Sequence, residues 1–158
     1  MTTTSSDRTS DGTSSDRQSD RIAELIAKGY RVRVEPCPHR VRAVVAGETV
    51  VDTTRALYLF ETRHAPVWYV PLDDVRRDLL APSDHTSRCP FKGEARYWSI
   101  VVGEERRDDA VWGYPYPIET CPDISGHVAF LWDRVDAWYE DDEEVTHIHP
   151  PRATSLSW

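Results

Sequence analysis

A short polar segment near the middle of the chain carries side chains of four chemical kinds within six residues. These are the hydroxyl of Ser87, the guanidinium of Arg88, the thiol of Cys89 and the ammonium of Lys92. Pro90 and Gly93 interrupt the segment, so we expect a turn there. Binding and catalytic groups concentrate in loops that a rigid sheet holds in place. The segment therefore predicts a site formed by these four residues.

Cys89 is the candidate catalytic residue. A thiolate between two cations is stabilised and nucleophilic, and His85 or His127 is the candidate base for it. The alternative is a structural role, because a free cysteine is often buried and then behaves as a small apolar group. The sequence leaves both alternatives open and names no reaction.

Lys92 has two interpretations as well. It can pair with an anionic group of a ligand, as a compact cation does. It can instead form a salt bridge with Asp84 or Glu94 that fixes the turn, because a buried lysine must be paired in either case.

Aromatic residues on the neighbouring strands can wall such a site. Trp98 follows the polar segment, and Trp112 and Tyr114 lie on the partner strand of a predicted hairpin. Strand alternation sends Tyr97 and Trp98 to opposite faces, so one set of rings packs in the core and the other can line a pocket. We assign Trp132 and Trp138 to core packing.

The frame that positions these residues is predicted to be a single β-rich domain over residues 19–149. Alternating apolar residues joined by short turns indicate hairpins. The expected strands are 31–35, 41–45, 48–52, 56–61, 67–70, 97–102, 110–114, 126–132 and 136–139. A short helix capped by Ser19 and ended by Gly29, and a second from Leu72 to Leu80, complete the prediction.

The two ends of the chain lack such patterns. Residues 1–18 contain almost nothing apolar, which predicts a disordered tail. Residues 150–158 are expected to be a loose segment. The acidic run at 140–144 is interpreted as a solvated turn.

Composition excludes several classes of function. The net charge of −8 argues against nucleic acid and membrane surfaces as partners, because both attract positive proteins. The three cysteines have no zinc-finger spacing, so no metal and no cofactor is expected. A zinc site assembled from Cys89, Cys121, His85 and His127 is a minor alternative. We see no signal peptide and no apolar segment of membrane length, and we expect a cytoplasmic protein with reduced thiols.

A longer pattern around the polar segment is specific. The stretch PLDDVRRDLLAPSDHTSRCPFKGEARYWSI, followed by AVWGYPYPI and ISGHVAFLWDRVDAWYEDDE, resembles the family known as domain of unknown function 427. The resemblance covers about residues 31–149. It implies a fold of two antiparallel sheets, tent-like or a sandwich, with a pocket between them, and it implies no established activity. The nucleotidyltransferase-like label that the family sometimes carries has no support here, because the chain has neither a P-loop nor a Gly-Ser pair followed by spaced aspartates.

Three functions compete at this stage. The first is a domain that binds a small anionic or amide-bearing molecule in an aromatic-walled pocket tipped by Lys92 and Arg88. The second is an enzyme that acts on such a molecule through Cys89 or a histidine. The third is a protein-interaction module that uses the acidic run.

Overall fold

The computed structural model describes residue 17, residues 20–148 and residue 150. The chain divides into two units, residues 1–31 and 32–158. The predicted tails at 1–18 and 150–158 lie, apart from Arg17 and Pro150, outside the described residues. No helix in the described part of the chain is long and apolar enough to cross a membrane.

In the first unit, Arg17 and residues 20–27 are helical, so helical structure occurs before the predicted cap at Ser19. The N–H of Gly29 donates to the carbonyl of Ile26, and the N–H of Tyr30 donates to the carbonyl of Leu25. This pair of hydrogen bonds is a Schellman motif, which requires a left-handed residue after the helix. Gly29 supplies it with a φ of 97°, so glycine ends the helix where the sequence predicts.

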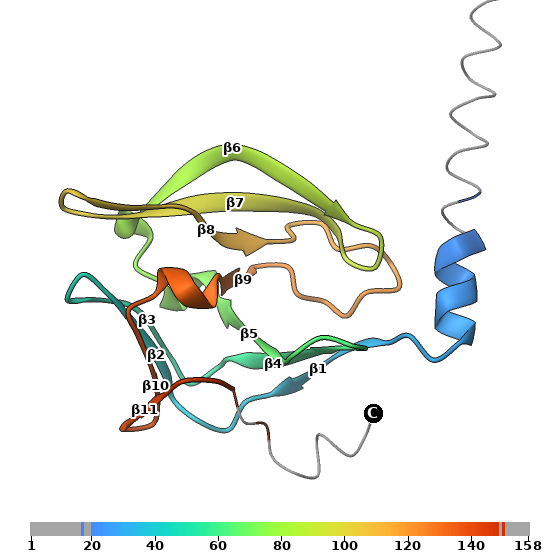
Figure 1. Cartoon of the computed structure of the whole chain (residues 1–158), viewed down its shortest axis with the longest axis horizontal. Coiled ribbons are helices and arrows are strands. Elements are labelled where there is room, and N and C mark those ends of the chain that lie inside the picture. Colours follow the sequence, from blue (N-terminus) through green and yellow to red (C-terminus); the bar gives the residue numbers. More distant parts are fainter. Residues whose placement is uncertain (1–16, 18–19, 149, 151–158) are drawn as a thin grey trace, which may run out of the picture. The chain divides into compact units, whose positions relative to one another are not determined.

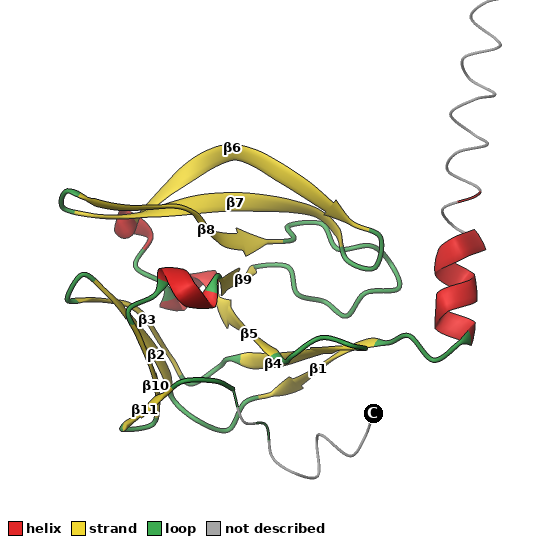
Figure 2. Ribbon diagram, in the orientation of Figure 1, coloured by secondary structure: helices red, strands yellow, loops and turns green. Residues whose placement is uncertain are grey.

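The second unit consists almost entirely of strands in two antiparallel sheets, as predicted (Figure 2). The seven-stranded sheet has the order β1 (Val32–Pro36), β4 (Leu57–Glu61), β5 (Val67–Pro71), β9 (His127–Phe130), β8 (Glu105–Gly113), β7 (Gly93–Val102) and β6 (Leu80–Cys89). The four-stranded sheet has the order β11 (Glu143–Val145), β10 (Ala137–Glu140), β2 (Val41–Val45) and β3 (Glu48–Thr53).

The larger sheet bends sharply along its length. In Figure 1, β6, β7 and β8 form one side of the bend, β4 and β1 form the other, and β5 and β9 join them. The ladder between β5 and β9 is short, because it contains only the pairs Val70–Val128 and Pro71–His127. No ladder pair joins Tyr69 or Trp68 of β5 to β9.

Three predicted hairpins are confirmed: β2–β3, β4–β5 and β7–β8. The predicted helix from Leu72 to Leu80 is wrong. The segment contains two 3-10 turns, η1 (Leu72–Asp74) and η2 (Arg77–Leu79). Val75 between them is extended, bridges to Val51 and is buried, and an extended residue at this point is incompatible with a continuous helix.

The polar segment was expected to be a loop, and this prediction is wrong for most of its length. Residues 80–89 form β6, an edge strand of the larger sheet. Its ladder with β7 shifts register between Pro82 and Thr86, so Asp84 and His85 lie at an irregularity of the strand. The turn is restricted to the residues between Cys89 and Gly93. The unpredicted strand β11 likewise converts most of the acidic run into a hairpin with β10.

Strand alternation divides the apolar side chains into two clusters. The first cluster joins the two sheets and includes Trp68 and Val70 of β5 together with Trp138 of β10. The second cluster takes the alternate residues, such as Leu59 and Tyr69, and includes Tyr114 and Ile124. Tyr97 packs against the second cluster and Trp98 against the first, which confirms that these two rings lie on opposite faces.

Candidate functional site

The turn between β6 and β7 is held by backbone hydrogen bonds. The N–H of Lys92 donates to the carbonyl of Cys89 at 3.2 Å, and the N–H of Ile118 donates to the carbonyl of Lys92 at 3.0 Å. Gly93 has a φ of 120°, and a Cβ there would lie 3.2 Å from the carbonyl oxygen of Tyr116. Glycine therefore allows the turn and the 115–125 segment to approach each other closely.

Lys92 is buried and forms an ion pair with Glu61 at the end of β4. Each of the two side chains is 10% exposed. The ammonium also lies 5.9 Å from the centre of the Tyr114 ring. The prediction that Lys92 pairs with Asp84 or Glu94 is wrong. Glu94 pairs with Arg96 instead. A buried and paired lysine is confirmed, but its partner comes from a distant strand.

Glu61 also lies near a second basic side chain, that of His64. Its Oε2 atom lies 3.7 Å from Nε2 of His64, which follows it in the β4–β5 turn and is 61% exposed. The carboxylate therefore lies between a buried ammonium and an imidazole that reaches solvent. Burial of an ion pair costs hydration, and this cost is offset only when both charges are well paired.

Several protonated groups surround this pair. Burial raises the pKa of the Cys121 thiol to about 11, although the Lys92 ammonium acts in the opposite direction. Burial also raises the pKa of Tyr69 and that of Tyr114. At neutral pH these groups therefore act as neutral donors and acceptors, and Cys121 is a poor nucleophile.

The other predicted site residues lie in different surroundings. The hydroxyl of Ser87 lies 2.8 Å from that of Tyr97 on exposed surface. Arg88 is exposed on β6, whereas Cys89 is partly buried against the second cluster. Trp98 packs against the first cluster, on the opposite face from Tyr114. The structure thus gathers Cys89, Lys92 and Tyr114 beside the second cluster, and the role of all seven predicted residues as ligand contacts stays a prediction.

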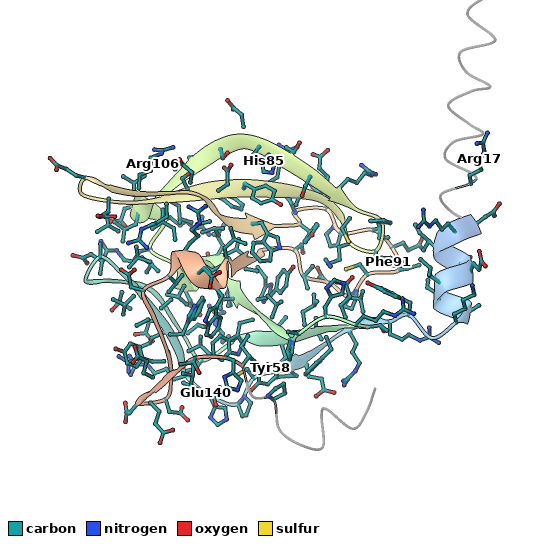
Figure 3. The ribbon with its side chains drawn as sticks, in the orientation of Figure 1. Arg17, Tyr58, His85, Phe91, Arg106 and Glu140 are labelled. Carbon is teal, nitrogen blue, oxygen red and sulfur yellow. The ribbon has the colours of Figure 1, made fainter. Side chains whose placement is uncertain are left out.

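The candidate bases have other contacts. The ring of His85 lies 4.4 Å from that of Tyr97, and Nδ1 of His127 lies 3.1 Å from the carbonyl oxygen of Ser125. Figure 3 places His85 on the outer strand β6 and Phe91 near the turn that follows it. Among the described residues no group of three or more histidine, cysteine or acidic side chains is arranged to hold a metal ion, and the four-residue zinc alternative is not such a group.

A cavity of about 590 Å³ lies beside the ends of β5 and β9 that form no ladder pairs with each other. Continuing the register of their ladder would place Trp68 opposite Phe130, but no ladder pair forms there. The space is lined by residues of both sheets and by the segments that follow them: Ala65, Pro66, Val67, Trp68, Trp112, Phe130, Leu131, Trp132, Trp138, Thr146, His147 and Ile148. Its lining is almost wholly apolar, which is typical of small-molecule sites.

Tryptophan rings dominate this lining. Trp132 and Trp138 are stacked, with ring centres 5.1 Å apart and planes inclined by 15°. The Trp68 ring lies 5.5 Å from that of Trp138 and 6.0 Å from that of Trp132. Trp68 and Trp138 are buried, whereas Trp112 and Trp132 are only partly buried. Leu131 is 41% exposed, an unusual exposure for a large apolar side chain at a cavity.

Of the residues that the sequence suggests for a site, only Trp112 lines this cavity. Its indole N–H donates to the hydroxyl of Tyr69 at 3.2 Å, so it connects the cavity to the second cluster. The predicted core packing of Trp138 is confirmed, because its side chain is 4% exposed. The density of tryptophan between residues 130 and 138 is the signal that points to this region.

Comparison with known proteins gives a family but no activity. No curated protein matches the chain. One family model, described as a domain of unknown function (DUF427), matches residues 33–141, which include β2 to β10, the Lys92–Glu61 ion pair and all of the cavity lining except Thr146, His147 and Ile148. The chain therefore belongs to the DUF427 family.

Proposed function

We propose that this domain binds a small planar molecule in the cavity beside Trp68 of β5 and Phe130 of β9. The observation that carries the proposal is the cavity itself, whose lining includes four tryptophans from four different segments. Large rings that stay partly exposed, such as Trp112 and Trp132, offer apolar surface to a ligand at little cost in conformational entropy.

The size of the cavity agrees with this proposal. Ligand pockets commonly enclose about 300–1,000 Å³, with mostly apolar walls and a few polar groups. The polar side chains of the lining include Thr146 and His147, and Oγ1 of Thr146 lies 3.1 Å from Nδ1 of His147. The cationic tip that the sequence suggests is not part of the proposal, because the Lys92 ammonium already pairs with Glu61.

A blocking variant tests the proposal. Ala65 is exposed and lines the cavity, so Ala65→Trp should place a ring in the opening with little effect on folding. Arg106 is also exposed but does not line the cavity, and Figure 3 shows it at the far end of the β7–β8 hairpin, so Arg106→Trp is the matched control. Binding of indole, quinoline and phenol would be measured by saturation-transfer NMR.

We expect at least one probe to bind the wild-type protein and Arg106→Trp, and to lose binding in Ala65→Trp. Equal binding to all three proteins would show that the probes bind elsewhere. Equal binding, or no binding by any probe, would overturn the proposed function.

A further inference from the structure

Two indole N–H groups at the cavity have no hydrogen-bond acceptor among the described residues. They belong to Trp68 and Trp138, which are 3% and 4% exposed. The nitrogen of Trp112, which lines the same cavity, differs because it donates to Tyr69. A buried indole N–H usually finds a partner, and an unpaired one is a destabilising feature that calls for an explanation.

The position of these two donors suggests what pairs with them. Both rings line the cavity, and both lie against the ring of Trp132. The nitrogens are covered by surrounding atoms, so a ligand reaches them by displacing a neighbour. Trp132 is the candidate for this displacement, because it is only partly buried and belongs to the short 3-10 turn η3 (Trp132–Arg134).

We infer that the ligand of the cavity carries a neutral carbonyl oxygen, as in an amide, that accepts a hydrogen bond from the indole N–H of Trp68 or Trp138. This inference rests on the proposed function and adds the chemical class of the ligand. Among the described residues the lining includes one histidine and no lysine or arginine, so a carboxylate would lose its hydration there without gaining a permanent counter-charge. A neutral carbonyl pairs with the donor without that cost.

The inference predicts an order of affinity opposite to the order expected from the hydrophobicity of the ligands alone. Benzamide, benzoate, benzylammonium and toluene share one ring and differ only in its substituent. In a cavity without free donors toluene binds best, because desolvation of an amide is unfavourable. With a free donor we expect benzamide to bind at least about fivefold more tightly than toluene, the ratio given by one net hydrogen bond. Benzoate and benzylammonium should bind more weakly than benzamide.

Single substitutions identify the donor. Trp68→Phe and Trp138→Phe keep an aromatic ring and remove the N–H, so at least one of them should lower the ratio of benzamide affinity to toluene affinity by about fivefold. Trp98→Phe is the matched control, because it makes the same change at a tryptophan that does not line the cavity. Its ratio should stay at the wild-type value. An unchanged ratio in both Trp68→Phe and Trp138→Phe would overturn the inference.

The wild-type protein gives an independent measurement that does not depend on the folding of any variant. With ¹⁵N-labelled tryptophan, benzamide should move the indole N–H signal of Trp68 or Trp138 downfield, and toluene should not. Toluene binding as tight as benzamide binding would overturn the carbonyl inference and leave the proposed function standing. Failure of all four probes would overturn the inference, and the indole, quinoline and phenol measurements would decide the proposed function separately.

Discussion

The substitution Lys92→Met tests the buried ion pair directly. Methionine keeps most of the apolar stem and deletes the ammonium, which leaves Glu61 with a carboxylate that is 10% exposed. Removal of one partner of a buried ion pair typically costs about 3–5 kcal/mol, because the other charge stays buried and uncompensated. We expect a loss of free energy of unfolding in this range. His64 at 3.7 Å is the group that can partly compensate, so the lower half of the range is the better expectation.

The chain contains its own matched control. Its two lysines are Lys28 and Lys92, and each pairs with a glutamate. Lys28 and its partner Glu24 are 69% and 65% exposed, so Lys28→Met should cost only about 0.3–0.5 kcal/mol. The double substitution Lys92→Met/Glu61→Leu removes both buried charges and should restore stability to within about 1 kcal/mol of the wild type.

Urea unfolding, monitored by tryptophan fluorescence, measures these differences in free energy of unfolding. The slope of that free energy against urea concentration must stay constant across the series. Labelling with an amine-reactive reagent adds a direct check, because Lys28 should react quickly and Lys92 slowly. The reasoning would be refuted by a Lys92→Met protein that loses less than about 1 kcal/mol, or by a double variant no more stable than the single one.

Three further predictions address other parts of the fold. Because burial raises the pKa of Cys121 to about 11, its rate of alkylation by iodoacetamide, in a variant whose other two cysteines are serine, should still be rising at pH 9; a plateau below pH 8.5 would contradict this. Gly113→Ala should lower the free energy of unfolding in urea by about 1–3 kcal/mol, because the alanine Cβ would lie 2.8 Å from the carbonyl oxygen of His127. An unchanged midpoint would show that the two strands shift apart without cost. A hydrogen bond from the N–H of Ala46 holds the pKa of Asp136 below its usual range, so its contribution to stability is present above about pH 4 and is lost as the pH falls through the depressed pKa. Asp136→Asn should therefore show a shallower loss of stability on acidification than the wild type, and equal slopes in an acid titration would argue against it.

The hairpins could be predicted from sequence because their information is local. Alternation and short turns define β2–β3 and β4–β5, and both hairpins form at nearly the predicted residues. The segment 72–80 shows where such reasoning fails. Leu72, Val75 and Leu79 have helical spacing, but burial of Val75 beside Val51 of β3 requires an extended backbone. A tertiary contact therefore overrides a local pattern.

The candidate site was only partly accessible to sequence reasoning for a related reason. If Lys92 is buried, its charge needs a partner, and this much follows from the sequence. The nearby acidic residues are Asp84 and Glu94, and nothing in the sequence indicates Glu61, which lies 31 positions away. The cavity depends on where the β5–β9 ladder ends, and that pairing joins strands far apart in the chain. Trp68 lies far along the chain from Trp132 and Trp138, and the three rings meet only through this tertiary arrangement.

The buried ion pair and the tryptophan cavity are connected through one pair of side chains. Trp112 lines the cavity and donates its indole N–H to Tyr69, and their rings meet edge to face at 6.5 Å. Tyr69 belongs to the same apolar cluster as Tyr114, whose ring lies beside the Lys92 ammonium. A ligand that moves Trp112 would therefore also disturb the second cluster. The Lys92–Glu61 ion pair lies beside that cluster and tolerates little displacement. A buried ion pair is retained at a cost in hydration, so displacement of either partner from the other is unfavourable.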